Sequence, residues 1–349
     1  MPNSGDLRAA VVGCGLIAGA HISALKKSRG VKVVAVCDLD ESLARNTAAK
    51  YGVPRSYTGI ADLLSEVRPD VVHITTPPRT HLSLSLQAMS AGCHVLLEKP
   101  IALTVGEFDR MAAAAAESGV LLSTIHNVLH VPVVLKARRL MEKGLIGELV
   151  LMQITQSEDN RSALTTDPDH WCHRLPGGIF GEMLPHPLYL ARSFFGDLKV
   201  MSVHSCKRTA PAWLANDEAC ILLEGGRGMV TITATVRGRG NIMLIEFIGT
   251  EGRLAAALPN GIVSVHKVAP GGSRRPMGFE NLRTARRWLT GTSSVALKVL
   301  LGSYPSTHST PICRFTEAVR GRGDVPVGLA EAREVTGLYE AVTSQIPAK

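Results

Sequence analysis

The stretch GGIFGEMLPHPLYLARSFFG places a carboxyl group and an imidazole four residues apart, as Glu182 and His186. On an unbroken helix, residues at i and i+4 lie on one face, so the two could act as an acid–base pair. Pro185 opposes an unbroken helix, because proline lacks the N–H and clashes with the carbonyl four residues earlier. Two arrangements stay open: a helix ending near Met183 and another with Pro187 in its first turn, or one kinked helix. In both, His186 lies at a backbone break.

A second reactive group follows the apolar run HVLL, which ends in Glu98, Lys99 and Pro100. Parallel strands release their carboxyl ends into the ligand crevice of an α/β sheet. A lysine at that point can hold a reacting hydroxyl and assist removal of its proton. The alternative is a surface Glu–Lys pair, but the position after a buried strand favours a functional site.

A glycine-rich turn comes directly after the first predicted strand and opens a helix, in the sequence VVGCGLIAGAH. The pattern is G-x-G-x-x-A. Its first glycine permits the tight turn, its second lets the backbone approach a pyrophosphate, and its small third residue lets helix and strand pack closely. The free N–H groups of the helix then bind phosphate. The predicted nucleotide loop comprises Gly13, Gly15, Leu16, Ile17 and Ala18.

Asp38 ends the second predicted strand, 20 residues beyond Ala18. A carboxylate there binds the ribose hydroxyls of the adenosine and repels a 2′-phosphate. Its neighbour Leu39 offers no positive charge, whereas Arg45 is close enough in sequence to count against a firm choice. The sequence therefore favours NAD over NADP as the cofactor.

The elements that must position these residues change in character along the chain. Through residue 127, short Val/Ile/Leu runs alternate with helical segments, which predicts a parallel sheet with helices on both faces. After about residue 148, strand-like segments follow one another with glycine-containing turns, which predicts an antiparallel sheet. Helical spacing returns near 280–302, 308–320 and 329–344. We expect an α/β plus α+β protein: an N-terminal Rossmann domain, residues 1–127, and a domain on a large, mostly antiparallel sheet, residues 128–349.

Composition excludes several classes of protein. The 349 residues are 45% hydrophobic and 19% charged, as in globular proteins, and no apolar tract approaches the roughly 20 residues of a membrane span. Seven cysteines without a C-x-x-C motif argue against a disulfide framework and a zinc ribbon, so we expect reduced thiols, a cytoplasmic location and no metal site.

The net charge of +8 would suit a protein that binds nucleic acid, but the sequence pattern argues against such binding. The densest basic group carries no interleaved stacking aromatics and matches no nucleic-acid-binding motif. It is either a solvated basic face or a site for an anionic substrate. Its members are Arg274, Arg275, Arg283, Arg286 and Arg287.

Three motifs together, GCGLIAGAH, TTPPRTH and LLEKPIALT, resemble those of the Gfo/Idh/MocA oxidoreductase family, and the resemblance extends to the closing segment FTEAVRGRGDVPVGLAEAREVTGLYEAV. It implies that the strand ends carrying TTP and EKP line the cofactor. His81 is either a further cofactor contact or part of a helix start, and His73 is more typical of a core histidine. The cofactor-lining residues implied are Thr75, Thr76, Pro77, His81, Glu98, Lys99 and Asn127.

The resemblance also covers the opening stretch. Relatives carry G-G-x-x-x-D-x-G-x-H, whose acid and histidine face the nicotinamide, and this chain has Glu182 for the aspartate and Pro185 for the glycine. Relatives also have Arg and an aromatic residue after the asparagine that corresponds to Asn127, where this chain has Val128 and Leu129. The implied catalytic residues are Lys99, His186 and Glu182, and the implied substrate contacts are Lys99, Asn127, Trp171, Glu182 and His186. Trp171 is equally interpretable as a core tryptophan.

These observations predict an NAD-dependent oxidoreductase that transfers hydride between nicotinamide and a hydroxyl or carbonyl of a sugar, polyol or nucleotide-sugar-like substrate. The basic group, where it is a binding site, favours an anionic substrate. Two alternatives stay open: chemistry without net redox on a tightly held NAD, or a nucleotide-binding regulator without catalysis. The resemblance implies a homodimer or homotetramer, and we expect neither nucleic acid nor a membrane as a partner.

Overall fold

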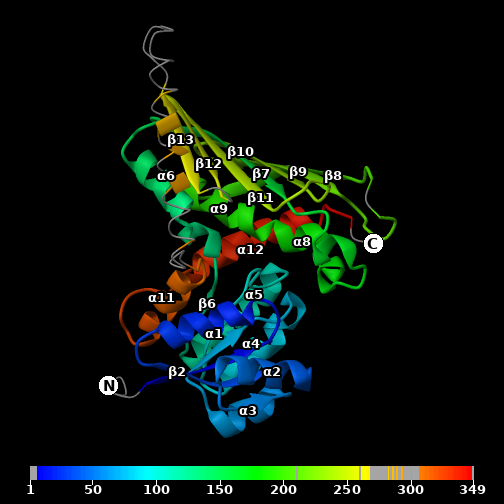
Figure 1. The fold of residues 1–349 in the computed structure, drawn as a ribbon, viewed down its shortest axis with the longest axis vertical. Coiled ribbons are helices and arrows are strands. Elements are labelled where there is room, and N and C mark those ends of the chain that lie inside the picture. Colours follow the sequence, from blue (N-terminus) through cyan, green and yellow to red (C-terminus); the bar gives the residue numbers. More distant parts are fainter. Residues whose placement is uncertain are drawn as a thin grey trace. The chain divides into compact units, whose positions relative to one another are not determined.

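The computed structural model describes residues 6–209, 211–258, 261–267 and 306–347, with a few separate positions between 282 and 300. Contacts within the chain define two compact units. The Rossmann unit comprises residues 1–127 and 306–340, and the sheet unit comprises residues 128–305 and 341–349. Figure 1 labels their elements. The predicted basic group and the predicted helix near 280–302 lie almost wholly outside the described residues.

The described part of the Rossmann unit is built on a six-stranded sheet in the order β3-β2-β1-β4-β5-β6, with every neighbouring pair parallel. Apolar clusters cover both faces of this sheet, which explains the continuous Val/Ile/Leu runs. The predicted parallel sheet is confirmed. Its strands are β1 (Leu7–Val12), β2 (Val31–Cys37), β3 (Ser56–Tyr57), β4 (Val71–Ile74), β5 (His94–Leu97) and β6 (Leu122–Thr124).

The helices of this unit differ in how they begin. The Asp40 side chain accepts the first N–H groups of α2, and the Thr104 hydroxyl accepts one from α5. Helix α1 begins without a side-chain cap, as α3 and α4 do, and its Ala18 and Ala20 N–H groups donate to main-chain carbonyls of the preceding turn. The helices are α1 (Ala18–Lys27), α2 (Glu41–Tyr51), α3 (Ile60–Val67), η1 (Pro78–Thr80), α4 (His81–Ser90) and α5 (Val105–Ser118).

A C-terminal segment completes the Rossmann unit. Helix α11 (Ser309–Val319) contacts α1, and its Ile312 and Phe315 are fully buried in the apolar cluster on that face of the sheet. Beyond it, the Ser123 hydroxyl donates to the Val327 carbonyl at 2.8 Å. Helix α12 (Leu329–Thr343) begins in this unit and ends in the other. Burial of apolar side chains thus groups residues 306–340 with the Rossmann sheet, although the sequence places them in the second domain.

The sheet unit carries seven strands in the order β13-β12-β11-β7-β10-β9-β8 among the described residues. Only the central pair of β7 and β10 is parallel there, which confirms the predicted, mostly antiparallel sheet. Its strands are β7 (Leu149–Ser157), β8 (Leu198–Cys206), β9 (Glu218–Gly225), β10 (Gly228–Thr235), β11 (Ile242–Gly249), β12 (Gly252–Ala257) and β13 (Ile262–Lys267).

Helices cover one face of this sheet, as Figure 1 shows. Helix α9 contacts β7 and β10, where Ile154 and Ile232 are buried, and α6 contacts β12 and β13. Among the described residues, no helix combines the length and apolar character needed to cross a membrane. The helical segments of this unit are η2 (Asn127–His130), whose first residue belongs to the Rossmann unit, α6 (Pro132–Glu142), α7 (Ala163–Thr166), η3 (Trp171–Arg174), α8 (Ile179–Met183) and α9 (Pro185–Phe195).

Candidate active site

The predicted nucleotide loop has the backbone geometry that its glycines require. Gly13 has φ +98°, and a Cβ there would lie 2.8 Å from backbone atoms of Thr75 and Thr76, so no other residue fits. A Cβ on Gly15 would meet no atom within 4 Å, so this backbone faces open space. Open backbone at Gly15 and the uncapped start of α1 together fit a bound pyrophosphate.

Asp38 braces this loop from the end of β2. One carboxylate oxygen accepts the Cys14 N–H at 2.7 Å, and the other accepts the Asp40 N–H at 3.0 Å. The adjacent Leu39 side chain is fully exposed. Arg45 forms an exposed ion pair with Glu41 on the same helix, at 2.6 Å. The surroundings of Asp38 therefore fit NAD better than NADP.

The TTP segment at the end of β4 is tied to the glycine loop and to the segment after β5. The Thr75 hydroxyl lies 2.6 Å from the Gly13 carbonyl oxygen, to which it donates. His81 is buried, and its ring nitrogens lie 2.9 Å from the Thr76 carbonyl oxygen and 3.2 Å from that of Ile101. Burial lowers the pKa of His81. These main-chain contacts match the helix-start interpretation of His81; its contact with a cofactor stays a prediction.

Lys99 follows β5 and precedes Pro100 with a cis peptide bond. Every residue from Val95 to Leu103 is buried except Lys99, which is partly exposed. The strand end therefore presents a single side chain to its surroundings, and that side chain is the predicted reactive amine.

Glu98 has the opposite orientation. Its carboxylate is buried, and Oε1 lies 2.9 Å from Nε2 of His21 in α1 and 3.5 Å from Nε2 of His308. Burial alone would raise the pKa of Glu98, but the hydrogen bonds from the two histidines hold it well below its usual range. Glu98 is thus an internal anion. A contact between Glu98 and the cofactor stays a prediction.

His21 and His308 are residues that the sequence analysis missed. His21 follows the glycine loop on the buried face of α1, so its helical spacing was an available signal. His308 lies 210 positions after Glu98, and no local pattern connects the two. His73, expected to be a core histidine, is fully buried, and its Nδ1 lies 2.9 Å from Nδ1 of His21.

In the sheet unit, the structure has the first of the two arrangements predicted for the opening stretch. Helix α8 ends at Met183, and α9 begins at Pro185, with Pro187 in its first turn. The chain enters α8 through Gly177 and Gly178, both with positive φ. Every residue from Ile179 to Ala191 is buried except Glu182 and His186, which are partly exposed. The two predicted chemical residues are thus the partly exposed ones within an otherwise buried pair of helices, although Oε2 of Glu182 is itself buried.

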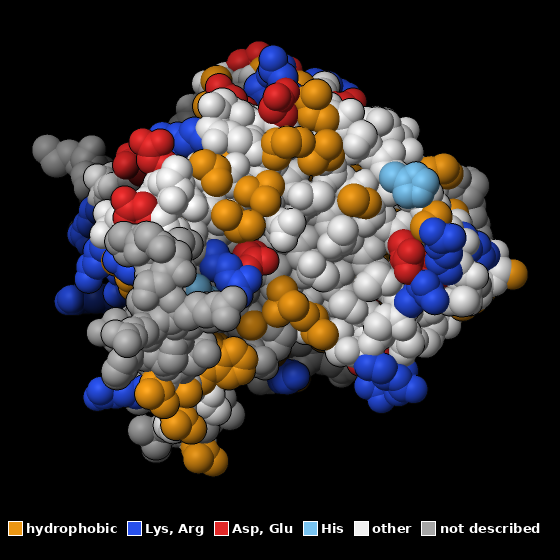
Figure 2. Space-filling view, turned by 90° about the horizontal axis from the view of Figure 1, so that it is seen from above, with side chains coloured by type: hydrophobic (Ala, Val, Ile, Leu, Met, Phe, Trp, Pro, Cys, Tyr) orange, Lys and Arg blue, Asp and Glu red, His pale blue; other side chains and the backbone are white. Residues whose placement is uncertain are grey.

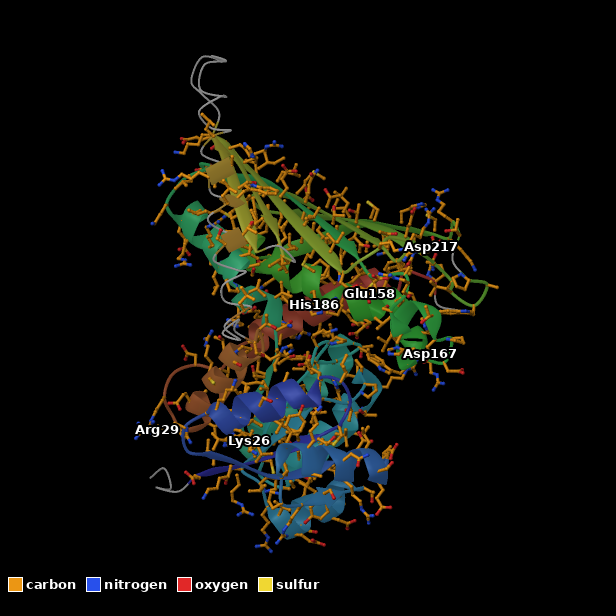
Figure 3. The ribbon with its side chains drawn as sticks, viewed as in Figure 1. Lys26, Arg29, Glu158, Asp167, His186 and Asp217 are labelled. Atoms are coloured by element: carbon orange, nitrogen blue, oxygen red, sulfur yellow. The ribbon has the colours of Figure 1, made fainter. Side chains whose placement is uncertain are left out.

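His186 is oriented by a partner that the sequence analysis did not name. Its Nδ1 lies 2.8 Å from the hydroxyl of Tyr189, a fully buried side chain one helical turn later. That hydroxyl also accepts the Val128 N–H at 3.0 Å. The phenol oxygen has a second lone pair that can accept an Nδ1–H of His186, and in that tautomer Nε2 carries no proton. Figure 3 shows His186 among the helices below the sheet.

Trp171 begins η3, upstream of the glycine pair. Its ring lies 5.3 Å from that of His170, between centroids, and it is only partly buried. Partial exposure favours a surface or ligand-facing role over a core tryptophan, and its substrate contact stays a prediction. Asn127, in the Rossmann unit, donates from Nδ2 to the Thr307 hydroxyl at 3.4 Å.

Comparison with known proteins extends over both units. Residues 7–126 match the model of an oxidoreductase family described as having an NAD-binding Rossmann fold, and residues 134–255 match the Gfo/Idh/MocA C-terminal domain. The chain is 29% identical to D-apiose dehydrogenase of Paraburkholderia graminis, over 71% of this chain and 66% of that protein. It is 28% identical to myo-inositol 2-dehydrogenase of Thermotoga maritima, over 55% of each. The matches thus span less than two thirds of these relatives' own length.

Among solved structures, the WlbA dehydrogenase from Bordetella pertussis, in complex with NADH and UDP-GlcNAcA, superposes with a TM-score of 0.79. The sequences are 19% identical, and the superposition covers 98% of this chain and 96% of that one. At this identity the likeness concerns the fold, and it includes both units.

Proposed function

This chain belongs to the Gfo/Idh/MocA oxidoreductase family, and we propose that it is an NAD-dependent dehydrogenase acting on a hydroxyl/carbonyl pair of a sugar, polyol or nucleotide-sugar-like compound. One observation carries the proposal. At the carboxyl end of the Rossmann sheet, an uncapped helix start, the Asp38 carboxylate and the solitary accessible Lys99 follow strands of a single sheet. Relatives named for apiose and inositol, and a fold neighbour with a nucleotide sugar, support the substrate class.

The chain's own residues supply the binding and proton chemistry. Gly13, Gly15 and Asp38 hold the dinucleotide, which when bound supplies a hydride acceptor or donor at its nicotinamide ring. Lys99 holds the reacting hydroxyl oxygen, and His186 takes its proton through Nε2. Glu182 orients His186 or raises its basicity. Asn127 and Trp171 contact the substrate.

Loss of function in two variants tests these roles. Lys99→Met and His186→Asn should each lower kcat on the preferred substrate by about 100-fold or more, the usual scale of general acid–base catalysis. Both variants should still quench or enhance NADH fluorescence as the wild type does, since neither residue holds the adenosine half. Activity retained in both variants would reject the mechanism.

We further propose that the open face of the seven-stranded sheet pairs with a second copy of the chain. That face exposes Met229 and Leu244, together with threonines on β7 and β10. Figure 2 shows apolar side chains gathered in clusters on the molecule seen from above. Light scattering should report a dimer or tetramer, and Leu244→Arg should shift it toward the monomer; a wild-type monomer would contradict this.

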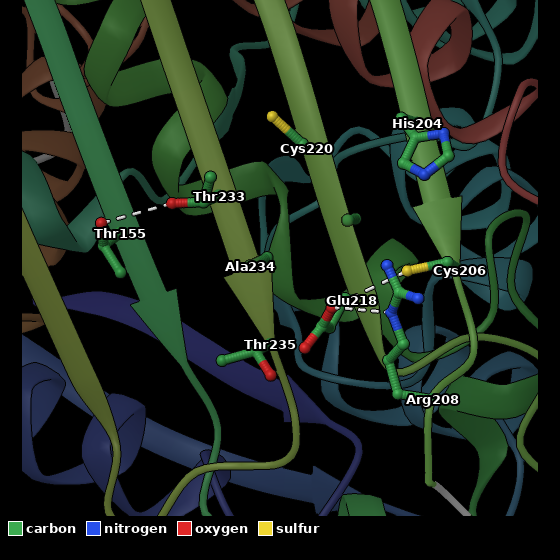
Figure 4. Close-up of a pocket in the computed structure, with 10 residues that line it drawn as sticks. Thr155, His204, Cys206, Arg208, Glu218, Cys220, Thr233, Ala234 and Thr235 are labelled. Atoms are coloured by element: carbon green, nitrogen blue, oxygen red, sulfur yellow. Dashed lines mark hydrogen bonds and ion pairs between the residues drawn. The ribbon is translucent and has the colours of Figure 1, made fainter.

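The same face holds a hollow of about 330 Å³, drawn in Figure 4. The hydroxyls of Thr155 and Thr233 lie 3.3 Å apart there, and Cys206 lies 3.7 Å from Glu218. Cys220 is exposed at its rim, and all seven cysteines are free thiols. Exposed free thiols persist in a reducing compartment, which supports our proposal of a cytoplasmic location.

A further inference from the structure

A line of polar contacts joins two strand ends of the Rossmann unit through the C-terminal segment. Asn127 donates from Nδ2 to Thr307 Oγ1 at 3.4 Å, and Thr307 Oγ1 lies 3.3 Å from Nδ1 of His308. Nε2 of His308 lies 3.5 Å from Glu98 Oε1, and Glu98 Oε2 accepts the Lys99 N–H at 3.2 Å. Asn127 and Lys99, which both belong to the predicted site, are thus connected through Thr307, His308 and Glu98. Thr307 lies 180 positions after Asn127.

The directions of these contacts are mutually consistent. Thr307 accepts from the Asn127 amide and has its own proton to give to Nδ1 of His308. His308 with its proton on Nε2 then donates to Glu98. Among the described residues, the groups in contact with the Glu98 carboxylate at His21, His308 and Lys99 are all N–H donors, as suits a buried anion.

A second histidine, His21, contacts the same carboxylate from the interior and is itself contacted by His73. His21 donates from Nε2 to Glu98, so its Nδ1 accepts from Nδ1 of His73. Burial lowers the pKa of His21. Burial and the neighbouring His21 together hold the pKa of His73 well below its usual value. Both rings are accordingly neutral, and Nε2 of His73 has no hydrogen-bond partner among the described residues. All three residues of this inner contact are buried, whereas the side chain of His308 is 12% exposed.

We propose that His308 is a positioning residue for Lys99. By donating to Glu98, it fixes the carboxylate that in turn holds the Lys99 main chain, and so sets where the reactive amine leaves the strand end. His308 suits this role because its side chain is 12% exposed, whereas that of His21 is fully buried. The proposal rests on the proposed function, in which Lys99 holds the reacting hydroxyl.

Three substitutions separate the two contacts of His308. In His308→Gln the amide NH₂ takes the place of Nε2 and still reaches Glu98. In His308→Asn the shorter amide takes the place of Nδ1 and reaches only Thr307. His308→Leu makes neither contact. We expect kcat of His308→Gln within about 3-fold of wild type, and that of the other two lowered about 10- to 100-fold, the scale of a misplaced catalytic group. KM for NAD should change little.

His94→Leu is the matched control. His94 begins the same strand, β5, and accepts the Leu121 N–H at 2.9 Å at the end of the strand away from Lys99. Its substitution should lower the melting temperature and leave kcat unchanged. If the three His308 variants lose activity equally, or if Asn restores it and Gln does not, the positioning role through Glu98 is wrong. Wild-type activity in all three would also overturn it.

Hydrogen exchange provides a readout that needs no substrate. The Lys99 amide should exchange about 10-fold faster in His308→Leu and His308→Asn than in wild type and His308→Gln, because its acceptor is no longer held. Equal exchange in all four proteins would overturn the positioning role. If exchange responds as expected but the wild type oxidises no hydroxyl compound, the dehydrogenase proposal fails and the positioning of Lys99 does not.

Discussion

Glu98, in the Rossmann unit, and His186, in the sheet unit, are both polar groups of the predicted site, but their surroundings differ. Glu98 is buried and accepts from His21, His308 and the Lys99 N–H. His186 keeps partial exposure, in a run where almost every neighbour is buried, and contacts Tyr189 through one ring nitrogen. A group with its hydrogen-bonding capacity filled inside the domain serves the scaffold. A partly exposed imidazole that is oriented through one ring nitrogen is suited to chemistry, and substitutions should separate the two kinds.

The largest expected effect is on catalysis in the sheet unit. His186→Asn should lower kcat by about 100- to 10,000-fold, because it removes the proton acceptor, and should change the free energy of unfolding by less than about 1 kcal/mol. Steady-state kinetics and urea unfolding measure the two quantities. If His186→Asn lowers both kcat and the free energy of unfolding strongly, His186 supports the fold rather than catalysis.

The reverse pattern is expected at His21. His21→Leu should lower the free energy of unfolding by about 3–5 kcal/mol, because it leaves the Glu98 carboxylate buried without its shortest hydrogen bond. The matched double variant His21→Leu with Glu98→Leu should recover part of that loss, since no buried charge then remains. If the single variant is as stable as the wild type, Glu98 is not the buried anion described above.

Acid should weaken the Rossmann unit through its buried histidines. The pKa values of His21, His73 and His81 are lowered by burial, so the unfolded chain binds protons that the folded chain does not. Stability is then full above the unfolded pKa of about 6.5 and falls as pH decreases below it, by at most about 1.4 kcal/mol per pH unit for each histidine. Glu98, whose pKa is lowered, adds a further loss below about pH 4.3.

Urea unfolding between pH 7 and pH 5 measures that slope. His73→Leu should make the slope shallower by the contribution of one proton, because it removes one of the buried histidines. A wild-type slope of zero over this range would contradict neutral buried histidines.

The smallest effect is expected at Tyr189. Tyr189→Phe removes the hydroxyl that contacts His186 and the Val128 N–H, so kcat should fall about 3- to 10-fold and its dependence on pH should shift. Stability should fall by about 1–2 kcal/mol, because a main-chain N–H loses its acceptor. An unchanged pH profile would mean that Tyr189 supports only the fold.

Local patterns account for what the sequence predicted well. Continuous apolar runs indicated the parallel strands, glycine spacing indicated the nucleotide loop, and Pro185 indicated the helix break that the structure has between Met183 and Pro185. Each of these features depends on residues within a few positions of one another.

Contacts between distant segments were not predictable in the same way. Glu98 and His308 are in contact although they lie more than 200 residues apart in the sequence. Phe315, on a helix near the C-terminus, is buried against the Rossmann sheet. Neither contact produces a periodic pattern in the local sequence. Tyr189 was within reach of sequence reasoning, because it lies at i+3 from His186 on a helix.

The stoichiometry of reduced nicotinamide to product tests the central proposal most directly. Wild-type protein would be incubated with excess NAD and a panel of sugars, polyols and nucleotide sugars, with absorbance followed at the reduced-nicotinamide band and products quantified by mass spectrometry. The account predicts one NADH for each molecule of carbonyl product formed. Product without net NADH would indicate internal return of the hydride, and nucleotide binding without any product would indicate a regulator; either result would contradict a dehydrogenase.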